Sequence, residues 1–172
     1  MKKNTKMAAL GGILLAATVV ILLLTSVVPG IELTLCIMAS VPAALMVVET
    51  GVKGGWIFYL ASVLASSILV PNKGCVLLYA ALFGLYAPVK YHIEMLHRRS
   101  AELFLKLLFF NLSAAGQLWL FGGLFFRAFQ IPDGWPLVVI LLFFEFFFLL
   151  YDYVFTLVLQ QYCLRFRGRI RF

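Results

Sequence analysis

The residues best suited to chemistry in this sequence are two carboxylates within its last apolar stretch. Glu145 and Asp152 are seven residues apart, which places them nearly on one face of a helix, and the stretch around Glu145 is rich in phenylalanine. Burying an unpaired charge in a lipid-like environment costs several kcal/mol, so an acid at this depth marks a functional site by default. We therefore expect Glu145 to contact a ligand or act as a proton-linked switch, and Asp152 to be a structural partner of a nearby cation.

Depth along the helices predicts the partners of Glu145. At about 1.5 Å per residue from Trp135, Glu145 lies about 15 Å deep, near the bilayer midplane. Asn111, counted from the opposite end of the preceding apolar segment, reaches the same depth. We expect an Asn111/Glu145 layer, and a purely structural hydrogen bond from Glu145 to Asn111 or Gln117 is the alternative.

The same count places Lys106 near the level of Asp152, which predicts a second layer. Glu102 competes for Lys106, because these two residues have the i,i+4 spacing of a helical ion pair. Lys106 and Asn111 are about 140° apart on a helical wheel, so they cannot both face the same neighbour.

Sparse polar groups mark the ends of the apolar segments that we assign to the outside. If a cavity opens there, these groups would line or cap it: Glu32, Asn72, Lys73, Tyr79, Gln117, Arg127, Gln130, Asp133 and Trp135. Lys73 and Arg127 would be the only cations facing an incoming anion. Solvated loop positions, and for Trp135 the interfacial aromatic belt, are the alternative. The candidate substrate-binding residues are therefore Glu145, Asn111, Gln117, Tyr79, Lys73 and Arg127.

Signatures of catalysis and of cofactor binding are missing from the sequence. It has no glycine-rich phosphate loop, HExxH or GxSxG motif. His92 and His97 do not share a helical face. The three cysteines lack metal-ligand spacing, which favours buried inert thiols; a disulfide between Cys36 and Cys75, both in outer helix halves, is the alternative. We expect no enzyme active site, no metal and no cofactor.

Composition indicates which solvent surrounds these residues. Of the 172 residues, 64% are hydrophobic and 12% are charged, whereas soluble domains are roughly half apolar and a quarter charged. The sequence therefore predicts one all-α membrane domain over residues 1–172, a polytopic bundle of about six helices. Apolar segments of spanning length lie near 7–28, 31–48, 52–70, 74–93, 101–127 and 135–164.

The distribution of basic residues predicts that both ends of the chain are cytoplasmic. Of the 14 Lys and Arg residues, all except Lys73 and Arg127 then fall on the inner side. The net charge of +7 sits at the ends of apolar runs and not on a polar face, which argues against a nucleic-acid partner. We expect a multi-pass protein of the cell membrane.

Ala8, Gly12 and Ala16 form a stripe of small residues on the first helix. Four-residue spacing places them on one face, where another helix backbone can approach closely in lipid. The stripe therefore predicts a helix contact. Packing within this chain is the alternative, because Ala39/Ala43, Ala61/Ala65 and Ala80/Gly84 repeat the spacing.

Together, the basic N-terminus, the Ala-xxx-Gly-xxx-Ala stripe, the six spans and the expected topology resemble a substrate-binding S component of energy-coupling-factor (ECF) transporters. The resemblance implies that Ala8, Gly12 and Ala16 dock on a transmembrane coupling subunit. It also implies a small solute bound between the outer halves of the later helices. No nucleotide-binding segment is present, so ATP hydrolysis would come from separate ATPase subunits.

A different class of protein fits the same pattern. The chain is also similar in architecture to the six-span rod-shape-determining inner-membrane proteins, which implies a non-transporting scaffold or interaction protein. In a scaffold, the interior polar groups should satisfy one another.

Overall fold

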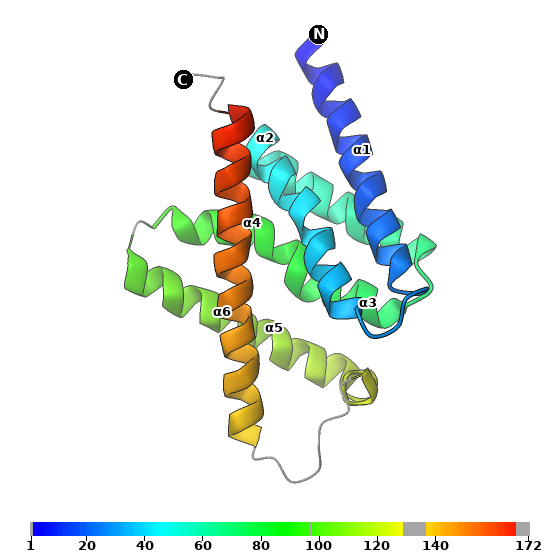
Figure 1. Ribbon diagram of the computed structural model, residues 1–172, viewed down its shortest axis with the longest axis vertical. Coiled ribbons are helices and arrows are strands. Elements are labelled where there is room, and N and C mark those ends of the chain that lie inside the picture. The colour runs from blue at the N-terminus through cyan, green and yellow to red at the C-terminus, as the bar shows by residue number, and fades with distance from the viewer. Residues whose placement is uncertain (1, 97, 129–136, 168–172) are drawn as a thin grey trace. The chain divides into compact units, whose positions relative to one another are not determined.

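The computed structural model describes residues 2–96, 98–128 and 137–167, and every element within these ranges is helical (Figure 1). The chain divides into two units, Met1–Phe129 and Gln130–Phe172, each described by itself. The all-α prediction is therefore confirmed for the described residues.

Among the residues that the structure describes, four helices are long and apolar enough to cross a membrane. They cover Thr5–Leu24, Glu32–Leu69, Lys73–Glu94 and Leu141–Arg165. Long apolar side chains also remain exposed along them, for example Ile13 and Ile57, as expected where lipid is the solvent. These helices agree with the prediction of a membrane protein.

The first helix, α1 (Lys2–Leu24), starts earlier and ends earlier than the expected segment 7–28. The chain leaves it through a tight turn, in which the N–H of Thr25 donates to the carbonyl of Leu22 at 3.2 Å. Gly30, with φ 91°, completes this turn because glycine adopts a positive φ without steric cost. One face of α1 packs along α2.

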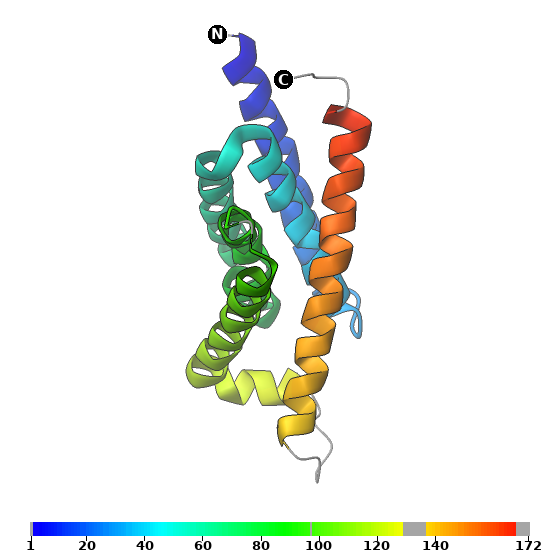
Figure 2. The same cartoon turned by 90° about the vertical axis from the view of Figure 1, so that its left-hand side faces the viewer.

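α2 (Glu32–Leu69) contains 38 residues and is interrupted at Gly51, whose φ of 80° and ψ of −178° are not helical. The interruption coincides with the boundary that Glu49, Thr50 and Gly51 predict between the segments 31–48 and 52–70. This backbone conformation is essentially restricted to glycine. Figure 2 shows α2 arching over part-way along its length, so that its two halves form a hairpin.

The next membrane-length helix is built from three consecutive pieces. α3 (Lys73–Leu78) leads into a π-helical turn, η1 (Tyr79–Phe83), and then into α4 (Gly84–Glu94). Together they match the expected segment 74–93. α2 packs against α4, and small buried residues of α2 permit close approach there and at α1: Ala39, Ser40, Ala43, Ala44, Ser62 and Ser66.

α5 (Arg99–Ala128) completes the first unit and corresponds to the expected segment 101–127. It contacts α3, η1 and α4. The second unit consists of α6 (Leu137–Tyr162) followed by a second π-helical turn, η2 (Cys163–Arg167). Phe143 and Phe147 lie one helical turn apart on α6, with ring centroids 4.8 Å from each other.

Candidate functional site

The π-helical turn η1 is the centre of a polar cluster inside the first unit. A π turn displaces the regular i→i−4 hydrogen bonds, and such turns are frequent at functional sites. The hydroxyl of Tyr59, on α2, donates to the carbonyl of Ala80 at 2.8 Å. The hydroxyl of Ser113, on α5, donates to the carbonyl of Ala81 at 2.5 Å. Side chains from two neighbouring helices therefore bind consecutive carbonyls of η1.

Tyr79 is fully enclosed within this cluster. Its hydroxyl and that of Ser62 are 2.9 Å apart, within hydrogen-bonding distance. Its ring lies against Gly84, where an added Cβ would come within 2.8 Å of the ring. Tyr79 was expected among outward-lying polar groups; in the structure it lies inside the helix packing. Its assignment to a substrate site stays a prediction.

Ser66 is the one described residue with a fully buried side-chain oxygen that has no hydrogen-bond partner. It lies one turn beyond Ser62 on α2, close to the end of the helix at Leu69. Other helical hydroxyls, such as Ser62 and Ser67, bond a carbonyl three residues earlier in the helix. Sequence reasoning missed Ser66, because only the packing around it distinguishes it from these serines.

Lys73 caps the end of α2. Its ammonium donates to the carbonyls of Ser67 at 2.6 Å and Val70 at 2.9 Å, which satisfies carbonyls left unpaired where the helix stops. The residue is exposed. Lys73 therefore has a structural role, and its predicted contact with an incoming anion remains untested.

The predicted site residues of α5 have different surroundings. The side-chain amide of Asn111 donates to the carbonyl of Leu107 at 3.0 Å. Gln117 is buried. Arg127 lies within the helix, but its side chain falls outside the described part, as do Gln130, Asp133 and Trp135 altogether.

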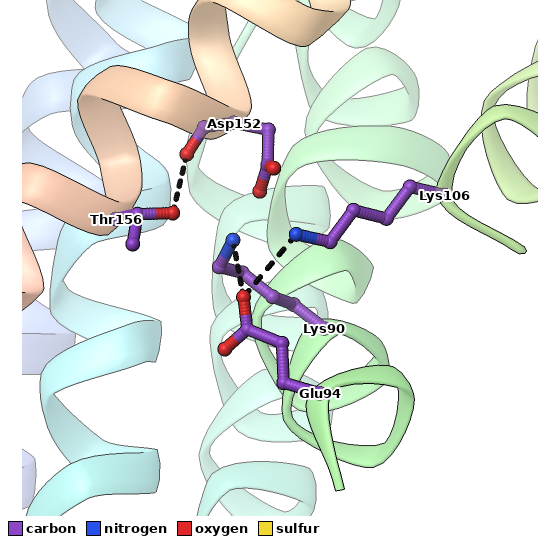
Figure 3. A network of polar contacts seen from close by, with 5 residues as sticks. All are labelled: Lys90, Glu94, Lys106, Asp152 and Thr156. Carbon is purple, nitrogen blue, oxygen red and sulfur yellow. Dashed lines mark hydrogen bonds and ion pairs between the residues drawn. The ribbon is translucent and has the colours of Figure 1, made fainter. Parts of the chain in front are cut away.

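Glu145 and Asp152 both lie on α6, in the second unit. The expected layers Asn111/Glu145 and Lys106/Asp152 each join the two units, so both stay predictions. Within α6, the hydroxyl of Thr156 donates to the backbone carbonyl of Asp152 at 2.7 Å (Figure 3).

Two buried lysines share one carboxylate where α4 and α5 meet. Glu94 Oε1 lies 2.8 Å from Lys90 Nζ on its own helix and 3.2 Å from Lys106 Nζ on α5 (Figure 3). The lysine side chains are 3% and 8% exposed, whereas that of Glu94 is 41% exposed. Because the ammonium groups are out of water, losing the carboxylate would leave two buried charges less compensated, which costs more than breaking a surface ion pair.

The Lys90 ammonium also lies 5.7 Å from the ring centroid of Tyr86, a cation–π distance. The i,i+4 spacing of Lys90 and Glu94 is visible in the sequence and could have predicted that pair. The link to Lys106 could not, because it depends on how α4 and α5 are rotated against each other. No ion pair joins Lys106 to Glu102 among the described residues, although their spacing allowed one.

Ala8, Gly12 and Ala16 are exposed on α1. A Cβ added to Gly12 would meet no atom within 4 Å, whereas one added to the neighbouring Gly11 would lie 3.6 Å from Met46 of α2. The helix therefore packs on α2 through the Gly11 face and presents the stripe on a different face. Packing within the first unit does not account for the stripe.

No family model, curated protein or solved structure matches this chain. Any function must therefore be argued from the residues and contacts of the chain itself.

Proposed function

We propose that this chain is a small-solute-binding membrane subunit of an ECF-type importer, which docks on a separate transmembrane coupling subunit through Ala8, Gly12 and Ala16. The observation that carries the proposal is the exposure of this stripe, with open space beside Gly12. Helices associate in lipid through close backbone approach at small residues. A stripe that the rest of the first unit leaves uncovered therefore suits a helix of another subunit.

The proposed topology has six crossings with both ends cytoplasmic. α2 supports it, since a straight helix of its length would extend about 57 Å, roughly twice the hydrocarbon core of a bilayer. Interrupted at Gly51, each half has a length suited to one crossing. The basic residues then obey the positive-inside rule, and the cell membrane is the proposed location.

The proposed solute site lies towards the outer side and includes Glu145, Asn111, Gln117, Tyr79, Lys73 and Arg127. Ser66 supports a polar ligand in this half, because a buried hydroxyl without a partner is rare and can accept or donate to a bound polar atom. Energy would come from separate ATPase subunits.

The docking face is tested by enlarging it. Gly12→Leu in the full-length protein should abolish co-purification of ATP-hydrolysing subunits, identified by mass spectrometry and by ATPase activity of the isolated complex. Gly116→Leu is the matched control, because an added Cβ at this glycine of α5 also meets nothing within 4 Å, and it should leave the complex intact. An ATPase complex that survives Gly12→Leu would contradict docking through the stripe.

A non-transporting scaffold is the second candidate, and the paired polar groups of the interior favour it. The hydroxyls of Tyr59, Tyr79 and Ser113 are all occupied by groups of this chain. A scaffold would still use the exposed stripe to bind a partner. Mass spectrometry of the purified protein separates the candidates, because a bound small molecule is expected for the importer subunit only.

A further inference from the structure

Cys36 and Cys75 lie side by side where three segments of the first unit meet. The Cys36 thiol donates to the backbone carbonyl of Cys75 at an Sγ–O distance of 3.7 Å. Both cysteines carry free thiols.

The surrounding backbone holds this contact in place. Asn72 caps α3 by accepting a hydrogen bond from the N–H of Cys75 at 3.2 Å. The backbone N–H of Asn72 also donates to the hydroxyl of Ser26 at 3.3 Å, which ties the start of α3 to the turn after α1. The approach of the two cysteines is therefore built into the packing of α1, α2 and α3.

The pair lies close to one end of the bundle. Cys36 is the fifth residue of α2 and Cys75 the third residue of α3. At about 1.5 Å per residue, both are within roughly 8 Å of a helix start, so a small solute has a short path to them. Cys75 is 7% exposed, whereas Cys36 is fully buried, so a reagent reaches Cys75 first.

We propose that Cys36 and Cys75 are a redox site that closes to a disulfide when hydrogen peroxide reaches this end of the chain. The site goes beyond the proposed importer function and does not depend on it. The Cys36 sulfur already touches the backbone of Cys75, so the two buried thiols need little backbone movement to join. The bond would fasten the start of α2 to the start of α3.

The chemistry balances with peroxide as the sole oxidant. The Cys75 thiolate attacks one peroxide oxygen; an S–O bond forms, the O–O bond breaks, and hydroxide leaves and takes up the thiol proton as water. The Cys36 sulfur then attacks the sulfenic sulfur of Cys75. An S–S bond forms, the S–O bond breaks, and the second hydroxide leaves with the Cys36 proton as water. Two thiols lose two electrons in total, and one peroxide becomes two waters.

The test treats the full-length protein in detergent or lipid nanodiscs with hydrogen peroxide, then denatures it and labels it with maleimide. Before labelling, the intact mass of the treated protein should be lower by two hydrogens. After labelling without a reducing agent, only Cys163 should carry maleimide. A peptide linking Cys36 to Cys75 should appear after digestion, and dithiothreitol should restore labelling of both cysteines.

Cys163→Ser is the matched control. It should form the Cys36–Cys75 disulfide as the parent protein does, because Cys163 lies in η2 of the other unit. Cys36→Ser should instead leave Cys75 labelled or oxidised further to the sulfinic acid. In the parent protein, persistent labelling of Cys36 and Cys75, oxygen addition without a cross-link, or only intermolecular disulfides would overturn the proposal. Because these outcomes are read on the unmutated pair, a folding defect in a variant does not obscure them.

Discussion

At the scale of single residues, the absence of a side chain at Gly84 lets the Tyr79 ring pack directly against the helix backbone. The Tyr79 ring occupies the space that any side chain at position 84 would need. The same close packing sets the position of the Tyr79 hydroxyl against Ser62, and it places η1 where Tyr59 and Ser113 reach its carbonyls. Substitution of this glycine should therefore disturb packing and hydrogen bonding together.

We predict that Gly84→Ala lowers the free energy of unfolding by about 1–3 kcal/mol, the usual range for overpacking a tight interior. Denaturation in mixed micelles, followed by circular dichroism, measures the change. Gly12→Ala is the control: its Cβ would meet nothing within 4 Å, and its stability should stay close to that of the parent. Equal effects of the two substitutions would argue against the Tyr79 contact.

Glu94 pairs with both buried lysines, so its charge should contribute to the stability of the fold. Glu94→Gln removes the charge that Lys90 and Lys106 share. We expect a loss of about 1–3 kcal/mol in stability, the range of hydrogen bonds to charged groups. Unfolding in mixed micelles again provides the measurement.

Glu102→Gln is the matched control for Glu94→Gln. It changes a carboxylate of similar exposure on α5 that makes no described ion pair, and it should have little effect. If Glu102→Gln were the more damaging change, Lys106 would depend on its neighbour in the helix and not on α4.

At the scale of elements, the proposed number of membrane crossings depends on the break in α2. Its break requires a positive φ at Gly51, which an L-residue adopts only under strain. The sequence already marked this position, since a charged residue, a threonine and a glycine interrupt an apolar run. In the proposed topology, a hairpin at Gly51 brings both ends of α2 to the same side of the membrane.

Site-directed labelling tests the hairpin. In a background without native cysteines, Val27→Cys and Pro71→Cys should react with a membrane-impermeant maleimide from one side, and Lys53→Cys from the other. All three native positions are exposed in the structure. Reaction of Val27→Cys and Pro71→Cys from opposite sides would mean that α2 crosses once.

On α1, the direction that each small residue faces was not predictable from the sequence. The small residues of its first half suggested a contact face, but spacing alone could not say which partner covers it. Gly11 and Gly12 are adjacent in sequence, yet one packs towards Met46 and the other faces open space. A rotation of about 100° per residue separates these two outcomes. The packing of α1 on α2 fixed that rotation.

At the scale of the whole molecule, Glu145 carries the proposal of solute binding. We expect Glu145→Gln to fold normally, with an unchanged elution profile, but to lose both the small molecule that mass spectrometry detects with the parent protein and the thermal stabilisation which that molecule provides. An uncharged amide of the same shape keeps the packing but removes the charge a ligand would meet.

Asp152→Asn, two helical turns further along α6, is the control and should retain the bound molecule. A folding defect in Glu145→Gln together with unchanged ligand content would assign Glu145 a structural role. The importer proposal would then need another site.

The sequence by itself predicted that lipid surrounds the helices, that the fold is all-helical and where most helices begin and end. Hydropathy is a local property summed along the chain, and turn residues such as Gly51 and Asn72 act on their own backbone. These signals therefore survive without knowledge of tertiary contacts. They predicted a membrane protein made of helices and the positions at which the chain breaks.

Only the tertiary structure decided which side chains meet. Glu94 joins Lys106, Ser62 joins Tyr79 and Cys36 contacts Cys75, although each pair is well separated in sequence. Such contacts depend on the depth and rotation of each helix, and a shift of one residue turns a side chain by about 100°. The π turn at η1 adds one such change in helix rotation, and no residue type in the sequence predicted it.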